Sequence, residues 1–198
     1  MKRLKISSSE APNFIGCWSL NEDIISDKII EFFENNKDLQ HQGATGTGVN
    51  TKYKKTTDIT INPNKLAEPN YEIFKVYFEK LHECYEDYKD QWPFVGKFMS
   101  KVNIGSFNVQ KYLPGDHFSK LHSERTHISA LHRVFAFMTY LNDVSDGGTT
   151  DFEFYKLKIK PEKGKTLIWP AEWTHAHTGS VLKSGSKYII TGWLHFPA

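Results

Sequence analysis

A series of short segments rich in β-branched and aromatic residues fills the second half of the chain and constrains its fold most. The segments cover residues 101–113, 133–142, 150–160, 165–169 and 187–196. Residues that favour turns separate them, for example Pro114-Gly115 and Asp146-Gly147-Gly148, because glycine and proline interrupt regular structure. Many short strands at similar spacing predict a sandwich or a barrel.

Two longer segments in the first half carry the periodicity of helices. We expect helices over residues 22–36, where Asn21 is a suitable N-cap, and over residues 71–90, after Pro69-Asn70. Their apolar stripes recur at three- and four-residue spacing and consist of Ile25, Ile29, Phe32 and Phe33 in the first helix and Tyr71, Phe74, Phe78, Leu81 and Tyr85 in the second. These stripes are typical of faces that pack into a core.

The order of the elements predicts the fold class. Helices come first and β-structure follows, so we expect an α+β protein, mainly β, with the N-terminal helices packed on one sheet. A length of 198 residues fits one domain. Residues 1–95 should supply helical support and loops, and residues 96–198 the β-structure. Within the first part, residues 1–20 are expected to be irregular, and residues 42–58, rich in Gly and Thr, to form a loop.

Composition excludes several classes of protein. The net charge is only +2 and the basic residues are spread along the chain, so no nucleic-acid partner is expected. No apolar run is long enough for a bilayer, and the polar N-terminus predicts no signal peptide. We therefore expect a cytoplasmic protein with no membrane contact. Cys17 and Cys84 lie far apart and form neither a CxxC motif nor a disulfide framework; Cys84 is expected to be buried.

The histidines indicate where chemistry takes place. Of nine histidines, six lie between residues 117 and 177. His122 and Glu124 are two residues apart, and on a strand such residues point to the same face. A second imidazole from a neighbouring strand, either His175 or His177, can complete a set of two histidines and one carboxylate. This set leaves metal positions open and is typical of non-haem Fe(II) oxygenases, whereas structural zinc sites have four ligands.

The order of further motifs matches a known family. Residues 109–196 resemble the catalytic core of the prolyl 4-hydroxylase-like 2-oxoglutarate/Fe(II) dioxygenases, in particular small forms from phages and marine bacteria. The matching elements are Tyr112-x-x-Gly115, His122-Ser123-Glu124, Arg133 to Tyr140-Leu141, Gly147-Gly148-Thr149-Thr150, His177-Thr178-Gly179, and the strand from Lys187 to Trp193. The resemblance implies a double-stranded β-helix (jelly-roll) fold.

The resemblance also implies roles for individual residues. His122, Glu124 and His177 correspond to the ligands of Fe(II). Lys187 corresponds to the residue that anchors the distal carboxylate of 2-oxoglutarate. Tyr112 and Thr150 match positions that hydrogen-bond the same cosubstrate, and His175, Arg133 and Trp193 are expected to surround the site or wall its pocket, as are Trp169 and Trp173. His177 is preferred to His175 as the distal ligand because it lies ten residues before Lys187.

The activity implied by the resemblance is hydroxylation of a C–H bond, with O₂ as oxidant and release of succinate and CO₂. The first expectation for the substrate is a prolyl residue of a peptide or protein, with a small molecule as the alternative, and ascorbate is the candidate reductant. Two departures from the family pattern concern the carboxylate, which is Glu124 where prolyl hydroxylases have Asp, and Phe118, which replaces a common Tyr.

Two other functions are compatible with the same fold. A cupin-like metalloenzyme would bind a metal without 2-oxoglutarate, and a jelly-roll binding module would have no activity and could contact a partner through residues 42–58. A buried Lys187 favours the oxygenase, because a buried ammonium needs an anionic partner. Residues 42–58 and 125–132 are both candidates for a lid over the entrance.

Overall fold

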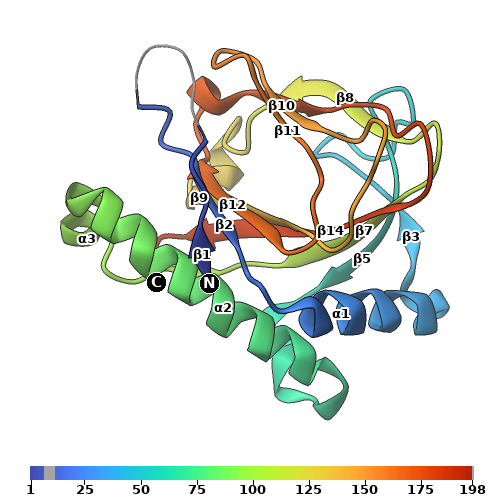
Figure 1. The fold of residues 1–198 in the computed structure, drawn as a ribbon, viewed down its shortest axis with the longest axis horizontal. Helices are drawn as coiled ribbons and strands as arrows, with labels where there is room; N and C mark the ends of the chain where they lie inside the picture. Colours follow the sequence, from blue (N-terminus) through green and yellow to red (C-terminus); the bar gives the residue numbers. More distant parts are fainter. Residues whose placement is uncertain (7–11, 198) are drawn as a thin grey trace.

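Two antiparallel sheets face one another and form the body of the molecule (Figure 1). The computed structural model describes residues 1–6 and 12–197. The larger sheet contains, in spatial order, β1 (Lys2–Arg3), β2 (Gly16–Ser19), β12 (Lys165–Pro170), β9 (Arg133–Tyr140), β14 (Lys187–His195), β7 (Phe107–Tyr112), β5 (Thr57–Ile61) and β3 (His41–Gln42), with β6 (Asn103–Ile104) paired to β14. The smaller sheet contains β11 (Leu157–Ile159), β10 (Thr150–Phe152), β13 (His177–Gly179), β8 (His117–His122) and β4 (Lys54–Lys55).

From β7 onward the chain crosses repeatedly between the sheets. β7, β9, β12 and β14 lie in the larger sheet, and β8, β10 and β13, which follow or separate them along the chain, lie in the smaller one. This alternation is the topology of a double-stranded β-helix and confirms the expected α+β, mainly β fold class. It also places the segments that carry the candidate ligands next to each other, because β13 pairs directly with β8.

The helices cover the outer face of the larger sheet (Figure 1). They are α1 (Asp23–Asn35), α2 (Glu72–Gln91) and α3 (Pro93–Phe98), with short 3₁₀ turns at Lys37–Leu39, Pro63–Ala67, Pro69–Tyr71, Ile128–Ala130 and Trp173–His175. Phe78 of α2 packs against Phe107 and Phe137 of the sheet, with ring centroids 4.8 Å and 6.0 Å apart. No helix of the described residues is long and apolar enough to cross a membrane.

Alternation along the strands divides the core into two layers. In β9, Phe135 and Phe137 face the helices, whereas Met138 and Tyr140 face the space between the sheets. The predicted stripe of α2 is confirmed, since Phe74, Phe78, Leu81 and Tyr85 are all buried; Tyr71 lies in the preceding 3₁₀ turn. Cys84 is buried, as expected, and both cysteines are free.

Two segments expected to be irregular contain strands. Within residues 1–20, β1 and β2 extend the larger sheet, and Trp18 of β2 is fully buried. Within residues 42–58, β4 and the beginning of β5 are paired strands. The expectation failed here because β4 is short and charged, and a buried ion pair between Lys54 and Asp58, 2.6 Å apart, allows these side chains to lie inside.

Other boundaries differ for local reasons. Asn21 adopts φ 53°, and α1 starts at Asp23 without a side-chain cap. The segment 150–160 is a hairpin of β10 and β11 rather than one strand. The segment 101–113 is interrupted at Gly105, where a Cβ atom would come within 2.1 Å of the His195 ring and would displace it.

Candidate metal centre and cosubstrate pocket

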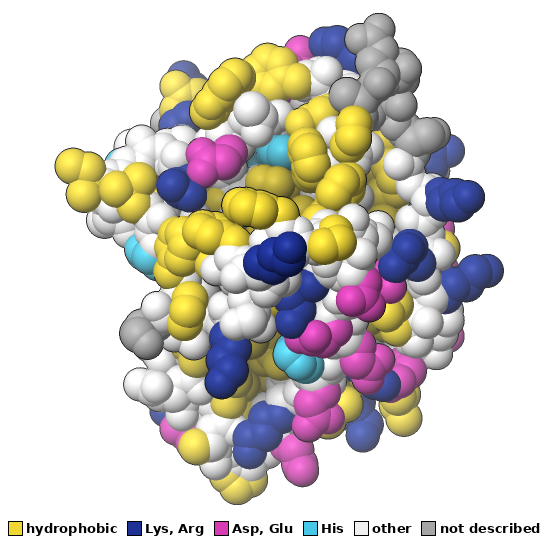
Figure 2. All heavy atoms as spheres, turned by 90° about the vertical axis from the view of Figure 1, so that its left-hand side faces the viewer, with side chains coloured by type: hydrophobic (Ala, Val, Ile, Leu, Met, Phe, Trp, Pro, Cys, Tyr) yellow, Lys and Arg dark blue, Asp and Glu magenta, His cyan; other side chains and the backbone are white. Residues whose placement is uncertain are grey.

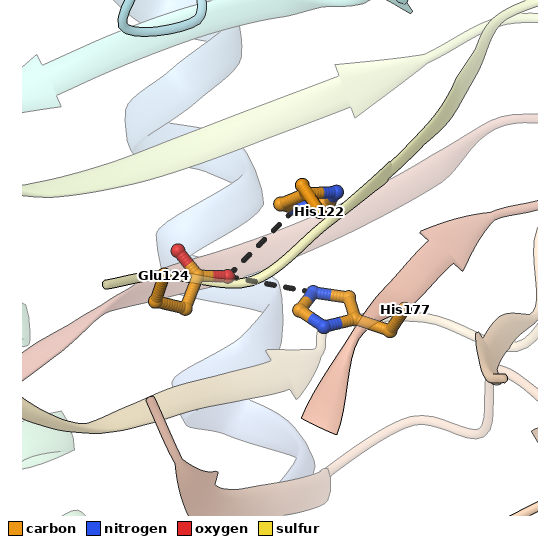
Figure 3. A group of neighbouring side chains, drawn as sticks. All are labelled: His122, Glu124 and His177. Carbon is orange, nitrogen blue, oxygen red and sulfur yellow. Dashed lines mark ion pairs between the residues drawn. The ribbon is translucent and has the colours of Figure 1, made fainter. Parts of the chain in front are cut away.

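Three side chains from β8, the segment that follows it, and β13 point toward one another (Figure 3). His122 is the last residue of β8, Glu124 follows two residues later, and His177 opens β13 directly opposite His122. The Nε2 atoms of His122 and His177 lie 3.7 Å and 3.4 Å from Oε1 of Glu124. In the described part of the chain, these residues form the group whose ligand atoms all lie within 4.8 Å of one another.

Hydrogen bonds to the backbone orient both imidazoles. Nδ1 of His122 donates to the carbonyl of Lys120 at 2.8 Å, and Nδ1 of His177 donates to the carbonyl of His175 at 2.9 Å. A neutral imidazole has one N–H, so its Nε2 then carries a free lone pair. Both free nitrogens face the same carboxylate oxygen, and this orientation of the rings is the one that metal binding requires.

The surroundings favour the protonation states that bind a metal. Burial, together with the proximity of His177, lowers the pKa of His122 to about 4. Burial alone would raise the pKa of Glu124, but its interactions with His177 and His122 lower it to about 2. The ring of Phe118 stacks on His122 with centroids 3.9 Å apart. A neutral imidazole and an ionised carboxylate are ready to ligate without losing a proton.

The second oxygen of Glu124 has its own partner. Nε1 of Trp193 donates to Oε2 of Glu124 at 2.7 Å. The guanidinium of Arg133 lies 3.6 Å from the centroid of the Trp193 ring, and its Nη1 donates to the backbone carbonyl of Glu124 at 3.0 Å. Arg133 and Trp193 therefore contact Glu124 at its two ends.

A cavity of about 550 Å³ opens beside the three residues. Residues 44–47 and 126–127, from the two segments expected to flank an entrance, line it together with Trp169 and Trp193. Lys187 lies on the cavity wall with an exposed fraction of only 2%. Its Nζ donates to the carbonyl of Gly148 at 3.0 Å and lies 3.9 Å from the centroid of the Tyr112 ring.

Lys187 has no acidic partner among the described residues. Burial therefore lowers its pKa to about 7. An ammonium group has three donors, and only one of them is used by Gly148. The remaining donors can bind an anionic group that enters the cavity.

The backbone turn at residues 147 and 148 requires glycine at both positions. Both have positive φ angles, 80° and 67°, which non-glycine residues rarely adopt. A Cβ atom on Gly147 would lie 2.2 Å from the carbonyl oxygen of Val181. The turn leads into Thr150, a buried residue of the cavity wall whose Oγ1 accepts a hydrogen bond from Tyr140 at 2.6 Å.

The hydroxyl of Tyr112 belongs to a buried chain of hydrogen bonds. Asp58 accepts from Lys54 at 2.6 Å and from Nε2 of Gln110 at 2.9 Å. Oε1 of Gln110 then faces Tyr112, whose hydroxyl donates to it at 3.0 Å. In this structure the hydroxyl proton of Tyr112 is therefore already used, and a cosubstrate would have to displace Gln110 to receive it.

His175 lies outside this group of ligands. Two-residue spacing on an extended strand would place His175 and His177 on one face, but this interpretation is wrong because His175 lies in the 3₁₀ turn before β13. It is buried, and its Nε2 donates to the carbonyl of Asn13 at 2.8 Å. Trp173 does not wall the cavity either, since it is 67% exposed and packs on Phe154.

Comparisons with known proteins support the expected resemblance. Residues 107–195 match the model of the 2OG-Fe(II) oxygenase superfamily. A probable prolyl 4-hydroxylase 9 from Arabidopsis thaliana is 28% identical over 45% of this chain and 40% of its own length. The chicken (Gallus gallus) prolyl 4-hydroxylase subunit alpha-2 is 27% identical over 43% of this chain and 17% of its own length. The second half of the chain is therefore similar to prolyl 4-hydroxylases. The chain spans less than half the length of these curated relatives.

Solved structures confirm the prolyl 4-hydroxylase-like fold. The viral collagen prolyl hydroxylase from Paramecium Bursaria Chlorella virus-1 has a TM-score of 0.67 at 20% identity, covering 94% of this chain and 98% of that one. A Pseudomonas putida prolyl-4-hydroxylase has a TM-score of 0.70 at 14% identity, with 94% and 95% covered. A prolyl hydroxylase from Trichoplax adhaerens, in complex with a hypoxia inducible factor peptide fragment, has a TM-score of 0.72 at 16% identity, with 93% and 84% covered.

Several residues around the candidate site were not identified from sequence. Gln110 shares a strand face with Tyr112, two residues away, so the alternation of β7 could have revealed it. Phe152 packs near His177, with ring centroids 5.4 Å apart, and the alternation of β10 gives a similar signal. Lys54 and Asp58 carried no signal, because nothing in a charged segment shows that it will be buried.

Proposed function

We propose that this chain is an Fe(II)- and 2-oxoglutarate-dependent dioxygenase that hydroxylates a C–H bond. The observation that carries the proposal is one cavity bordered both by the His122, Glu124 and His177 group and by the buried ammonium of Lys187. A metal site alone would fit many enzymes. A buried cation on the wall of the same cavity supports a cosubstrate that is bound at both ends.

The donor set fits Fe(II). Two imidazole nitrogens and one carboxylate oxygen on one side of a cavity leave the other metal positions free, as in non-haem Fe(II) oxygenases. Ligands at right angles with bonds of about 2.1 Å lie roughly 3 Å apart, so small movements would bring the separations of 3.4 Å and 3.7 Å to bonding geometry. When bound, Fe(II) with 2-oxoglutarate and O₂ supplies the oxidising power for hydroxylation.

The roles of the chain's own residues follow from their contacts. His122, Glu124 and His177 would hold the metal. Lys187 would bind the distal carboxylate of 2-oxoglutarate through its unused donors, and Tyr112 supports that ammonium with the face of its ring. Thr150 lies on the same cavity wall, where its hydroxyl can donate to the cosubstrate. Ascorbate would serve only as a reductant and is assigned no residue.

The substrate that we propose is a prolyl residue of a peptide or protein. The similar enzymes act on prolyl groups by name, and the similar Trichoplax enzyme holds a peptide. Exposed apolar side chains close to the ligand-bearing segments in the sequence, such as Leu121, Ile128 and Trp173, are suited to contacts with a peptide chain. Figure 2 shows hydrophobic side chains gathered around a hollow in the surface, with a histidine inside it.

The first experiment is anaerobic addition of Fe(II) and 2-oxoglutarate to the purified protein, followed by visible absorption. The proposal predicts a metal-to-ligand charge-transfer band that His122→Ala and His177→Ala abolish and that His175→Ala, the matched control, retains. Lys187→Ala should require much more 2-oxoglutarate. A folded protein with no band would contradict the proposal and favour a cupin-like metalloenzyme or a binding module.

The substrate is tested separately by succinate release with proline-containing peptides and with free proline. Stimulation by peptides, with a mass increase of one oxygen on the prolyl residue, supports the proposed substrate class. Hydroxylation of a small molecule but of no peptide would agree with the proposed reaction and contradict the proposed peptide substrate.

A further inference from the structure

We infer that Trp193, stacked against Arg133, is a positioning residue that fixes Glu124 so that only its Oε1 faces the two histidines. This inference rests on the proposed function, because it concerns the geometry in which Glu124 meets a metal. Its basis is the set of contacts around this one carboxylate.

The two oxygens of Glu124 have different surroundings. Oε2 accepts the indole N–H of Trp193 at 2.7 Å, while Oε1 lies 3.4 Å from Nε2 of His177 and 3.7 Å from Nε2 of His122. An indole nitrogen only donates, so this contact always selects a carboxylate oxygen. With Oε2 engaged, a metal held by the histidines would meet Oε1 alone.

The backbone at Glu124 also needs support. β8 ends at His122, so Glu124 lies beyond the last residue that the strand pairing holds. A glutamate has one more rotatable bond than an aspartate, and its ordering costs more conformational entropy. Arg133 supplies the missing constraint by donating to the backbone carbonyl of Glu124 at 3.0 Å.

Arg133 and Trp193 together form a clamp on Glu124, and the stacking of their side chains makes this clamp rigid. Both residues come from paired strands of the larger sheet, β9 and β14, and the guanidinium lies 3.6 Å from the centroid of the indole ring. Nε of Arg133 is buried without a hydrogen-bond partner in the described part of the chain. A buried donor left unpaired is unusual. The guanidinium keeps this position without a hydrogen bond at Nε, so its stacking on Trp193 and its bond to the Glu124 carbonyl are the contacts that place it.

The clamp is matched to the length of a glutamate. An aspartate at this position is one methylene shorter, so its carboxylate cannot reach the histidines and the indole N–H of Trp193 in the same way. The indole N–H of Trp193 should therefore contribute to metal affinity when Glu124 is present and should contribute nothing in the Glu124→Asp variant. This gives a double-mutant cycle in which the two substitutions are coupled.

The test measures Co(II) dissociation constants without 2-oxoglutarate, using the visible ligand-field bands of Co(II). Four proteins are compared: wild type, Trp193→Phe, Glu124→Asp and the double variant. Trp193→Phe keeps an aromatic ring for the stack but removes the N–H. We expect about a tenfold weaker Co(II) affinity and altered bands when Glu124 is present, as for other groups that orient metal ligands, and no further change when aspartate replaces it.

Two further variants separate positioning from general damage. Trp173→Phe alters an exposed tryptophan that packs on Phe154 and is not among the described residues that line the cavity, so it should leave the Co(II) dissociation constant unchanged. Arg133→Lys should weaken Co(II) binding in both backgrounds, because its contact is with the backbone of residue 124, and it tests the clamp even if Trp193→Phe folds poorly. Equal losses from Trp193→Phe in both backgrounds, or no loss in either, would overturn the inference while the metal site stands. A folded wild type that binds no Co(II) would overturn the proposed function as well.

Discussion

At the scale of single residues, the charge of Lys187 should make the site sensitive to pH. Its ammonium is buried and contacts the Gly148 carbonyl and the face of the Tyr112 ring. Burial lowers the pKa of Lys187 to about 7. The ligand-free protein therefore carries this charge below pH 7 and loses it above, whereas bound 2-oxoglutarate would keep the lysine protonated.

The dissociation constant of 2-oxoglutarate should thus be constant below about pH 7 and rise by up to tenfold per pH unit above it. Calorimetric titration of the Co(II)-loaded protein across this pH range measures the change. In Lys187→Met, binding should be weak and its pH dependence should disappear. A flat wild-type profile would show that Lys187 does not bind the cosubstrate or does not titrate in this range.

A second residue-scale prediction concerns Tyr112. Its hydroxyl proton is donated to Gln110, which Asp58 holds in place. Tyr112→Phe keeps the ring beneath Lys187 and should weaken 2-oxoglutarate binding only slightly, because the lost hydroxyl was not free to donate. Calorimetric titration with 2-oxoglutarate measures the dissociation constants of Tyr112→Phe and Lys187→Met for comparison with wild type. A loss as large as that of Lys187→Met would mean that the hydroxyl leaves Gln110 and bonds the cosubstrate.

At the scale of secondary structure, the alternation of side chains between the two faces of a strand explains which site residues can be predicted from sequence. His122 and Glu124 were expected to project together because they are two residues apart, and they do. His175 and His177 have the same spacing, but the backbone turns between them, so the rule failed. Period-two arguments hold only where the chain is extended, and the sequence near His175 gives no sign of the turn.

The short strands β4 and β5 provide an element-scale prediction. Lys54 and Asp58 form a buried ion pair with side-chain exposures of 5% and 3%. Lys54→Met leaves Asp58 without its cation and should destabilise the protein by about 3–5 kcal/mol. Urea unfolding with an unchanged m-value measures this loss.

Lys55 is a matched control, because its ion pair with Asp116 leaves the lysine side chain 51% exposed. Lys55→Met should cost less than about 1 kcal/mol. If Lys54→Met were equally mild, water would reach Asp58 and the pair would not hold the strands together. This buried pair could not be predicted from sequence, since charged residues in a Gly- and Thr-rich segment indicate a solvated loop.

At the scale of the whole molecule, the N-terminal half completes the core. Phe107 and Phe137, on the outer face of the larger sheet, are fully buried beneath α2. The sequence predicted helices on one sheet, because their stripes are periodic. It did not reveal that β2 and β5 extend that same sheet, since both are short and lie next to segments with turn composition.

We therefore propose that residues 1–198 form one folding unit, and we predict that a fragment of residues 96–198 does not fold. Without α2, the side chains of Phe107, Phe135 and Phe137 would be exposed together on one sheet face, and burial of each contributes about 1.5–3 kcal/mol, a large part of the stability of a domain. The fragment should lack near-ultraviolet circular dichroism, bind no Co(II) and associate in solution, while the full chain unfolds cooperatively. Cooperative unfolding of the fragment alone would show instead that the jelly roll is an independent domain and that the helices are dispensable.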